Sequence, residues 1–228
     1  MQSGTAFKKT IKTLAILTVF ISFAMASLVF GRQDKEIELP KDPFERGKVL
    51  YKLERYAEAK PNFEQALKKN PKRVQVRYYL GKTLFALNNL NAAWNNFDRL
   101  VQIAPKSPLG YLGRAEVLIK REQYDNALAD IFLVEERQAD IADSYYFKGL
   151  IYGYKKSIPE AVTALEKCLE IQPNYSYAHY QLGLAYYQIK RFDLTIVHLS
   201  RFLDLEPKAP EAEQVRALLD FIRKRNPA

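Results

Sequence analysis

A pattern of thirty-four residues recurs five times along this chain, and no insertion separates one copy from the next. The copies begin at Pro40, Val74, Pro108, Ala142 and Ser176. In the second copy, apolar residues recur at helical spacing up to Leu87, stop at Asn88 and Asn89, and resume at Ala93. Each copy therefore predicts two short helices joined by a tight turn, and such copies bury a core only by stacking on their neighbours.

Five columns of the aligned copies hold residues that suit a tight helix pair. The first helix keeps a small residue that lets its partner approach closely: Gly47, Gly81, Ala115, Gly149 and Gly183. The second helix keeps another: Ala59, Ala93, Ala127, Ala161 and Thr195. Large residues that fill the space between helices follow one turn later: Phe63, Phe97, Ile131, Leu165 and Leu199, then Ala66, Leu100, Val134, Cys168 and Phe202. A proline, which cannot continue a helix, closes every copy except the third: Pro71, Pro105, Pro173 and Pro207, with Ala139 as the exception.

These columns resemble the signature of the tetratricopeptide repeat family. The resemblance covers residues 40–209, divided into repeats 40–73, 74–107, 108–141, 142–175 and 176–209. It implies an all-α fold, a right-handed α-solenoid of five helix pairs. The chain departs from the family where Arg46, Arg114 and Lys148 replace the leucine before the small residue. We expect the stems of these residues to cover apolar surface while their charges reach water.

The last segment, residues 210–228, predicts one more helix without a second partner. Ala212, Val215, Leu218, Leu219 and Ile222 form one apolar stripe, and charged residues occupy the rest of the helix. A repeat stack needs such a capping helix, because an uncovered apolar face at its open end invites aggregation.

The first thirty-one residues have a different pattern, typical of an export signal. A lysine-rich start is followed by an uncharged run from Thr13 to Gly31, and no acidic residue appears before Asp34. Ala26 fits the cleavage site of a signal peptide, whereas the apolar run also reaches the length of a membrane anchor. A polar linker follows at 32–39. Both interpretations place the repeats outside the cytoplasm, in the periplasm or cell envelope, and the second anchors them to the inner membrane.

The formal charge of +9 is unevenly distributed. Residues 40–73 have ten basic and five acidic side chains, and residues 74–107 have four and one, whereas residues 108–141 have four and seven. A basic chain suggests nucleic acid as a partner, but an export signal and the absence of a nucleic-acid-binding motif argue against it. The basic repeats are consistent with anionic lipid, with an acidic polypeptide, or with a solvated surface that has no partner.

No residue pattern in the chain indicates catalysis. His179 and His198 fit no metal site or catalytic triad, and we expect structural roles for both. Cys168 is the single cysteine and occupies a packing column, so a buried inert thiol is expected. Phosphate-binding loops, nucleophile elbows and zinc-ligand spacings are absent. The sequence predicts a protein that is not an enzyme and that has no cofactor or metal.

A functional surface is instead expected on the first helices, which in tetratricopeptide arrays line a concave groove that holds a peptide. Helical spacing places Phe85, Glu116 and Lys120 among the residues that face this groove. The residues predicted to bind a partner there are Lys48, Tyr78, Tyr79, Lys82, Tyr146, Phe147, Leu150, Tyr154, Tyr177, Tyr180 and Gln181. Tyr79, Phe147, Tyr154 and Tyr177 are the stronger candidates, because the family does not commonly carry aromatic residues there for packing. Large aromatic side chains serve as interface anchors, although inter-repeat packing remains an alternative.

The sequence therefore predicts a noncatalytic scaffold or adaptor of the cell envelope that binds a protein or peptide partner in its groove. The basic clamp with which related co-chaperones bind carboxylate tails has no counterpart at the matching positions. The alternative is a peripheral membrane component held by the N-terminal segment and by the basic repeats one and two.

Overall fold

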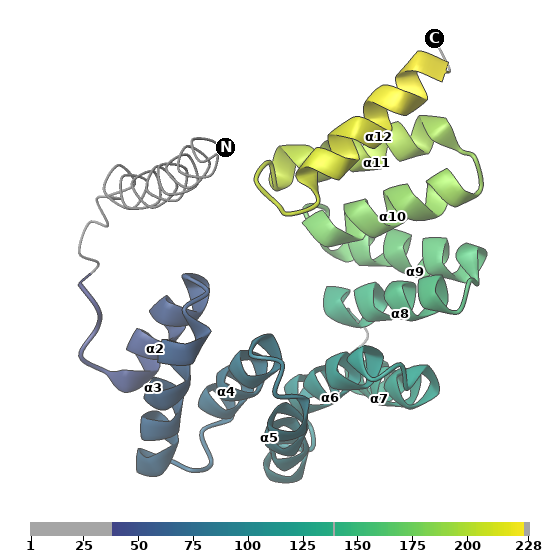
Figure 1. Ribbon diagram of the computed structural model, residues 1–228. Helices are drawn as coiled ribbons and strands as arrows, with labels where there is room; N and C mark the ends of the chain where they lie inside the picture. The colour runs from purple at the N-terminus through teal and green to yellow at the C-terminus, as the bar shows by residue number, and fades with distance from the viewer. Residues whose placement is uncertain (1–37, 139, 226–228) are drawn as a thin grey trace, which may run out of the picture. The chain divides into compact units, whose positions relative to one another are not determined.

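The structure is a computed structural model that describes residues 38–138 and 140–225. The described residues are helical, with no strand, and the chain runs through the helices in order (Figure 1). The helices are α2 (Pro43–Lys52), α3 (Tyr56–Lys69), α4 (Val74–Ala86), α5 (Leu90–Ile103), α6 (Pro108–Lys120), α7 (Tyr124–Arg137), α8 (Ala142–Tyr154), α9 (Ile158–Ile171), α10 (Ser176–Gln188), α11 (Phe192–Leu205) and α12 (Ala212–Arg225). The expected signal peptide or anchor at 1–31 and Ala139 lie outside these residues.

The helices pack as consecutive pairs, from α2 with α3 to α10 with α11, and each pair packs on the next. First helices also touch across repeats, α2 with α4, α4 with α6, α6 with α8 and α8 with α10, whereas no such contact joins the second helices of the described chain. Each of α6, α8 and α10 begins thirty-four residues after the first helix of the preceding repeat. The expected helix-pair solenoid is therefore confirmed, and its first helices form one continuous layer.

The packing columns form the core. Phe63, Phe97, Ile131, Leu165 and Leu199 are almost completely buried, and the small residues lie against them. A Cβ atom added at Gly81 would lie 2.5 Å from Cε1 of Phe97, and one at Gly149 would lie 2.5 Å from Cγ of Leu165. The first helix therefore needs a small residue at this position, because the large residue of the second helix occupies the space that a side chain would take.

The turn inside each pair repeats a single backbone geometry. Its second residue has a positive φ of 58–61° in all five repeats: Glu54, Asn88, Glu122, Lys156 and Lys190. In the first repeat the N–H of Glu54 donates to the carbonyl of Tyr51, and that of Arg55 donates to the carbonyl of Leu50. This pair of bonds defines a Schellman motif, which satisfies the last carbonyl groups of the first helix.

The ends of several helices follow from local sequence. Asp42 caps α2, because its side chain accepts a hydrogen bond from the N–H of Glu45, and Pro43 occupies the first helical position. Ser107 and Pro108 start α6 in a similar way. Asn89 caps α5 by accepting from the N–H of Ala92.

The expectation that the basic charges at the leucine position reach water is wrong for Arg114. Its guanidinium group bonds to the carboxylate of Asp130, at 2.5 and 3.1 Å, and to that of Asp98, at 2.9 Å. Lys148 likewise pairs with Glu135 of α7. Because Asp130 is buried beside Arg114, the charge of Arg114 is neutralised within the fold and is not solvated.

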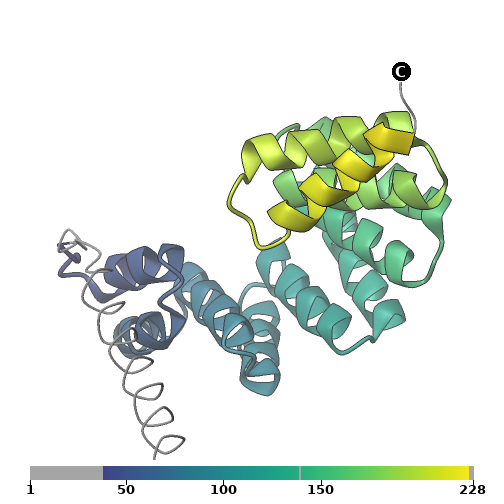
Figure 2. The same ribbon diagram turned by 45° about the horizontal axis from the view of Figure 1, so that its top comes forward.

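The C-terminal helix α12 lies along α11 (Figure 2). Ala212, Val215, Leu219 and Ile222 are buried, and Val215 and Leu219 form a cluster with Leu199 and Phe202 of α11. The apolar stripe therefore faces the stack, as a capping helix requires. Within residues 38–225, no helix combines the length and the apolarity needed to cross a membrane.

Candidate functional site

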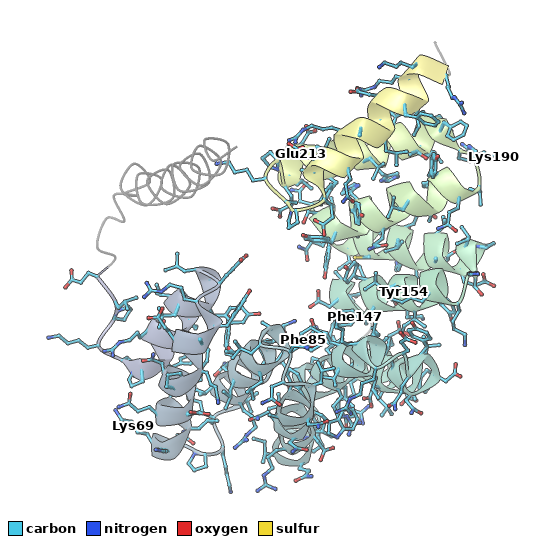
Figure 3. The ribbon with its side chains drawn as sticks, in the orientation of Figure 1. Lys69, Phe85, Phe147, Tyr154, Lys190 and Glu213 are labelled. Atoms are coloured by element: carbon cyan, nitrogen blue, oxygen red, sulfur yellow. The ribbon has the colours of Figure 1, made fainter. Side chains whose placement is uncertain are left out.

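A hollow of about 390 Å³ lies across the first helices α4, α6 and α8. Its apolar and aromatic lining consists of Phe85, Ile119, Tyr124, Tyr146, Phe147, Leu150 and Tyr154. Figure 3 labels Phe85, Phe147 and Tyr154, which lie close together along these helices. Glu116, Lys120 and Glu122 add charge to the lining. We call this hollow and its lining the first-helix groove.

Tyr154 is the most exposed aromatic side chain of the groove, at 57% of its surface. Its ring stacks on that of Tyr124 from α7, with centroids 5.5 Å apart and planes tilted by 18°. One face of the ring is therefore held in place while much of the side chain remains open to a partner. Such a pre-ordered aromatic surface loses little entropy on binding.

Lys82 of α4 and Glu116 of α6 form an ion pair, and Glu116 also lines the groove. The ammonium nitrogen lies 2.6 and 2.7 Å from the two carboxylate oxygens. Burial lowers the pKa of Lys82, but Glu116, Tyr78 and Asp143 together outweigh this effect and raise the pKa above its ordinary value. Lys82 is therefore charged and already has an anionic partner, so it adds less positive potential to the groove than the sequence suggests.

A smaller recess of about 120 Å³ adjoins this ion pair. Tyr78, Asp143, Tyr146 and Tyr175 line it together with the pair. The Tyr175 hydroxyl donates to Asp143 at 2.9 Å, and the Tyr175 ring stacks on Tyr146 with centroids 4.9 Å apart. Burial raises the pKa of Tyr146 and of Tyr175, so both hydroxyls remain protonated and can donate hydrogen bonds.

The other predicted groove residues lie in packed surroundings. The Tyr79 ring lies among Phe44, Tyr51 and Phe63, with centroid distances of 5.6–5.8 Å. Tyr177 and Tyr180 pack on Phe202 and on the cluster that contacts α12. Lys48 pairs with Glu45, and Gln181 lines a separate recess with Leu150 and Tyr154. The structure therefore brings together Tyr78, Lys82, Tyr146, Phe147, Leu150 and Tyr154, but not the whole predicted set.

Helical spacing places Phe85, Glu116 and Lys120 on the face of the groove, although they were not among the predicted binding residues. The spacing does not place Ile119, Glu122 and Tyr124 there. For Glu116 a signal was available in the sequence. It lies thirty-four residues after Lys82, so the two residues occupy the same position in adjacent repeats and carry opposite charges. Tyr124 comes from a second helix, which an inspection of first helices alone does not include.

The histidines and the cysteine lie elsewhere. His179 and His198 contact each other through their Nδ1 atoms, 2.9 Å apart, and Nε2 of His179 lies 3.0 Å from the carbonyl oxygen of Pro173. Burial raises the pKa of Cys168 to about 12, so its thiol remains protonated. Residues 38–138 and 140–225 hold no cluster of three metal-ligating side chains.

Paired helices that repeat every thirty-four residues, with a layer of first helices lined by aromatic residues, define a helical-repeat protein of the interaction-scaffold class. The chain belongs to the tetratricopeptide repeat family. Models of the tetratricopeptide repeat match residues 44–108 and 142–190.

Individual proteins show the same relationship. Tetratricopeptide repeat protein 6 of Homo sapiens is 26% identical over 168 residues, which make up 74% of this chain and 32% of that protein. The mitochondrial import receptor subunit TOM70 of Mus musculus is 22% identical over 183 residues, which make up 77% of this chain and 30% of the receptor subunit. The chain thus spans about a third of the length of these relatives. A crystal structure of a tetratricopeptide repeat protein of Thermus thermophilus matches with a TM-score of 0.70 and 24% identity, over 80% of this chain and 97% of that one.

Proposed function

We propose that this protein is a noncatalytic scaffold of the bacterial cell envelope that binds a partner polypeptide in its first-helix groove. The observation that carries the proposal is the gathering of Phe85, Phe147 and Tyr154 around one hollow, with Tyr154 largely exposed and stacked in place. Exposed aromatic side chains beside a hollow favour apolar anchor residues of a partner. The relatives support the same use, since one of them is named as an import receptor subunit.

The groove favours a partner with an apolar anchor over one with an acidic tail. Lys82, which lies beside the groove, is occupied by Glu116, and Glu116 and Glu122 outnumber Lys120 among the charged lining residues. Glu122 carries negative charge at the rim and forms no ion pair within the described chain. A partner segment with an apolar side chain for the hollow and a basic residue toward Glu122 fits this arrangement.

The double variant Phe85→Ala and Tyr154→Ala tests the groove. It removes two large side chains of the lining, and we expect a partner captured from envelope extracts by the full chain to be lost. The matched control is Phe132→Ala, because Phe132 is an aromatic residue of α7 that is 59% exposed but does not line the groove. Retention of the partner by the double variant, with the helical circular-dichroism signal intact, would exclude the groove as its site.

The cell-envelope location rests on the pattern of residues 1–31 and needs its own test. Fractionation of the source cells should recover the chain in the envelope, and its intact mass should show either cleavage after Ala26 or a retained anchor. Recovery of the full-length chain in the cytosol would overturn this part of the proposal without affecting the groove.

A second candidate function is peripheral membrane attachment through the first repeats. Lys68, Lys69 and Lys72 are exposed at the C-terminal end of α3 and in the turn that follows, and Figure 3 labels Lys69. Such a cluster attracts anionic headgroups. Salt-sensitive sedimentation of the chain with anionic vesicles, reduced by changing the three lysines to glutamine, is the expected result, and sedimentation that salt does not affect would contradict it.

A further inference from the structure

In repeat four a crevice lies between the helices α8 and α9, and one position of the second helix, held by Ala164, lines it. The residues at this position are Asn62, Asn96, Asp130, Ala164 and His198. In repeats two, three and five this residue contacts a polar side chain of the first helix, at 3.4 Å from Arg77, 2.5 Å from Arg114 and 2.9 Å from His179. The methyl group of Ala164 in repeat four can form no such bond.

Repeat three shows which chemical group occupies the corresponding place between its two helices. The Arg114 guanidinium group makes two hydrogen bonds to the carboxylate of Asp130. Its central carbon also lies 5.5 Å from the ring centroid of Trp94 and 5.5 Å from that of Tyr111. A planar cation between aromatic faces and a carboxylate is an arrangement that arginine satisfies better than lysine.

Repeat four keeps an aromatic wall but lacks the guanidinium group. Tyr145 occupies the position of Tyr111, and Lys148 occupies that of Arg114 but pairs with Glu135 of α7. Between α8 and α9 the crevice remains open, with a volume of about 650 Å³. Its lining includes Tyr145, Lys148, Tyr152, Glu160, Ala164 and Glu166.

The charges around this cavity favour a cation. Lys148 is neutralised by Glu135, and Lys167 by Glu170 at 2.8 Å. Glu160 and Glu166 then remain without a basic partner among the ion pairs of the described chain. Glu166 accepts a hydrogen bond from the Tyr186 hydroxyl at 2.5 Å, which leaves its negative charge in place.

We propose that the crevice of repeat four binds an arginine side chain of a partner polypeptide. The guanidinium group stacks on Tyr152 and pairs with Glu160 and Glu166, as Arg114 pairs with Asp130 one repeat earlier. The Lys148 ammonium already lies over the Tyr145 ring, 5.5 Å from its centroid, so Tyr152 offers the open face. This cavity shares no lining residue with the first-helix groove, and the proposal therefore does not depend on the function of the groove.

Titration of the ¹⁵N-labelled full chain with a short peptide tests the proposal. The probe is acetyl-Gly-Arg-Gly-amide, and its neutral isostere carries citrulline in place of arginine. We expect saturable shifts of the amide resonances of Tyr145, Tyr152 and Glu160, with a Kd about tenfold lower for the arginine peptide. Equal Kd values for the two peptides, or shifts confined to residues elsewhere, would overturn the proposal.

Ala164→Asn is the decisive variant, because asparagine is the residue that repeats one and two carry at this position. It fills the crevice and should abolish the shifts while leaving the thermal midpoint near that of the unmodified chain. If this variant fails to fold, the double variant Glu160→Gln with Glu166→Gln tests the proposal instead. Its isosteric amides remove the negative charge, so the arginine and citrulline peptides should then bind with equal Kd values. Glu136→Gln is the control, because Glu136 is exposed on α7 and does not line the cavity.

Discussion

At the scale of single residues, the glycine column of the first helices is the most restrictive feature of the fold. The Phe97 ring occupies the space where a Gly81 side chain would begin, with its Cε1 only 2.5 Å away. We expect Gly81→Ala to lower the free energy of unfolding by about 1–3 kcal/mol, because the ring must move within a packed core. Urea denaturation followed by circular dichroism measures this change.

Gly153 provides the matched control for that substitution. It lies in α8, where an added Cβ atom would have no neighbour within 4 Å. Gly153→Ala should therefore raise the free energy of unfolding by about 0.5–1 kcal/mol through helix propensity alone. Equal effects of the two substitutions would show that backbone preference, and not the Phe97 ring, governs the glycine column.

The paired histidines predict a pH dependence of stability. Nε2–H of His179 donates to the carbonyl of Pro173, so its Nδ1 is the acceptor and Nδ1–H of His198 the donor. Burial, and then the neighbouring His179, lower the pKa of His198 from 6.5 to about 4. Of the charged groups nearby, Glu166 opposes this shift in His198, whereas Arg201 adds to the lowering of the pKa of His179.

A histidine with a lowered pKa stabilises the fold in its neutral form. This contribution to the free energy of unfolding is complete above pH 6.5, the pKa of histidine in the unfolded chain. It is lost as the pH falls toward about 4, the pKa of His198 in the folded chain. The thermal midpoint of the unmodified chain should fall by about 2–4 °C more over this range than that of His198→Asn. Scanning calorimetry at several pH values measures the difference, and parallel curves for the two proteins would refute the assignment.

At the scale of helices and turns, the Schellman motif contains a repeated local strain. Four of its five positive-φ positions hold Glu or Lys, residues that disfavour this conformation, and only Asn88 suits it. Lys190, labelled in Figure 3, follows α10 and forms no ion pair within the described chain. Lys190→Gly should raise the free energy of unfolding by about 1 kcal/mol, because glycine adopts the conformation without steric cost.

The converse substitution checks the direction of this effect. Asn88→Ala replaces the one favourable residue of the set, so we expect the thermal midpoint to fall. If Lys190→Gly lowers the midpoint as well, the added flexibility of the unfolded chain outweighs the relief of strain.

The helix pairs could be predicted from sequence because their determinants recur in fixed columns. Gly81 and Phe97 have counterparts in the other repeats, so one periodic fit places every pair. The turns were less visible, since Glu54 and Lys190 are not residues that signal a positive φ. Arg114 was misjudged because its partner Asp130 lies in a different helix, and a pattern within one helix does not show what the next one supplies.

The groove was predicted only in part, for a similar reason. Helical spacing places Tyr79 and Tyr154 on comparable faces of their helices, but their surroundings differ. Three aromatic rings of the first repeat pack around Tyr79, whereas Tyr154 has a single stacking partner. Whether an aromatic side chain is packed in the core or exposed to a partner depends on the sizes of the side chains in the adjacent repeat. Helical spacing within one repeat does not show these contacts.

At the scale of the whole molecule, a stack of this kind gains its stability from neighbour contacts and is therefore most vulnerable at its ends. The C-terminal end depends on α12. Val215 and Leu219 cover Leu199 and Phe202 of the last pair, while the opposite face of α12 carries exposed residues such as Glu213, labelled in Figure 3. The two faces of this helix allow a test that compares substitutions on the buried face with substitutions on the exposed face.

Val215→Asp with Leu219→Asp should detach the capping helix, because two carboxylates cannot be buried against Leu199 and Phe202 without partners. We expect the thermal midpoint to fall by several degrees and the chain to associate as its concentration rises, since the last pair then exposes its apolar face. Glu213→Ala with Asp220→Ala alters the solvent face and should change neither property. Sedimentation velocity and thermal melts measure both. If the inward variant remains monomeric with an unchanged midpoint, the last pair is stable alone and α12 is not its cap.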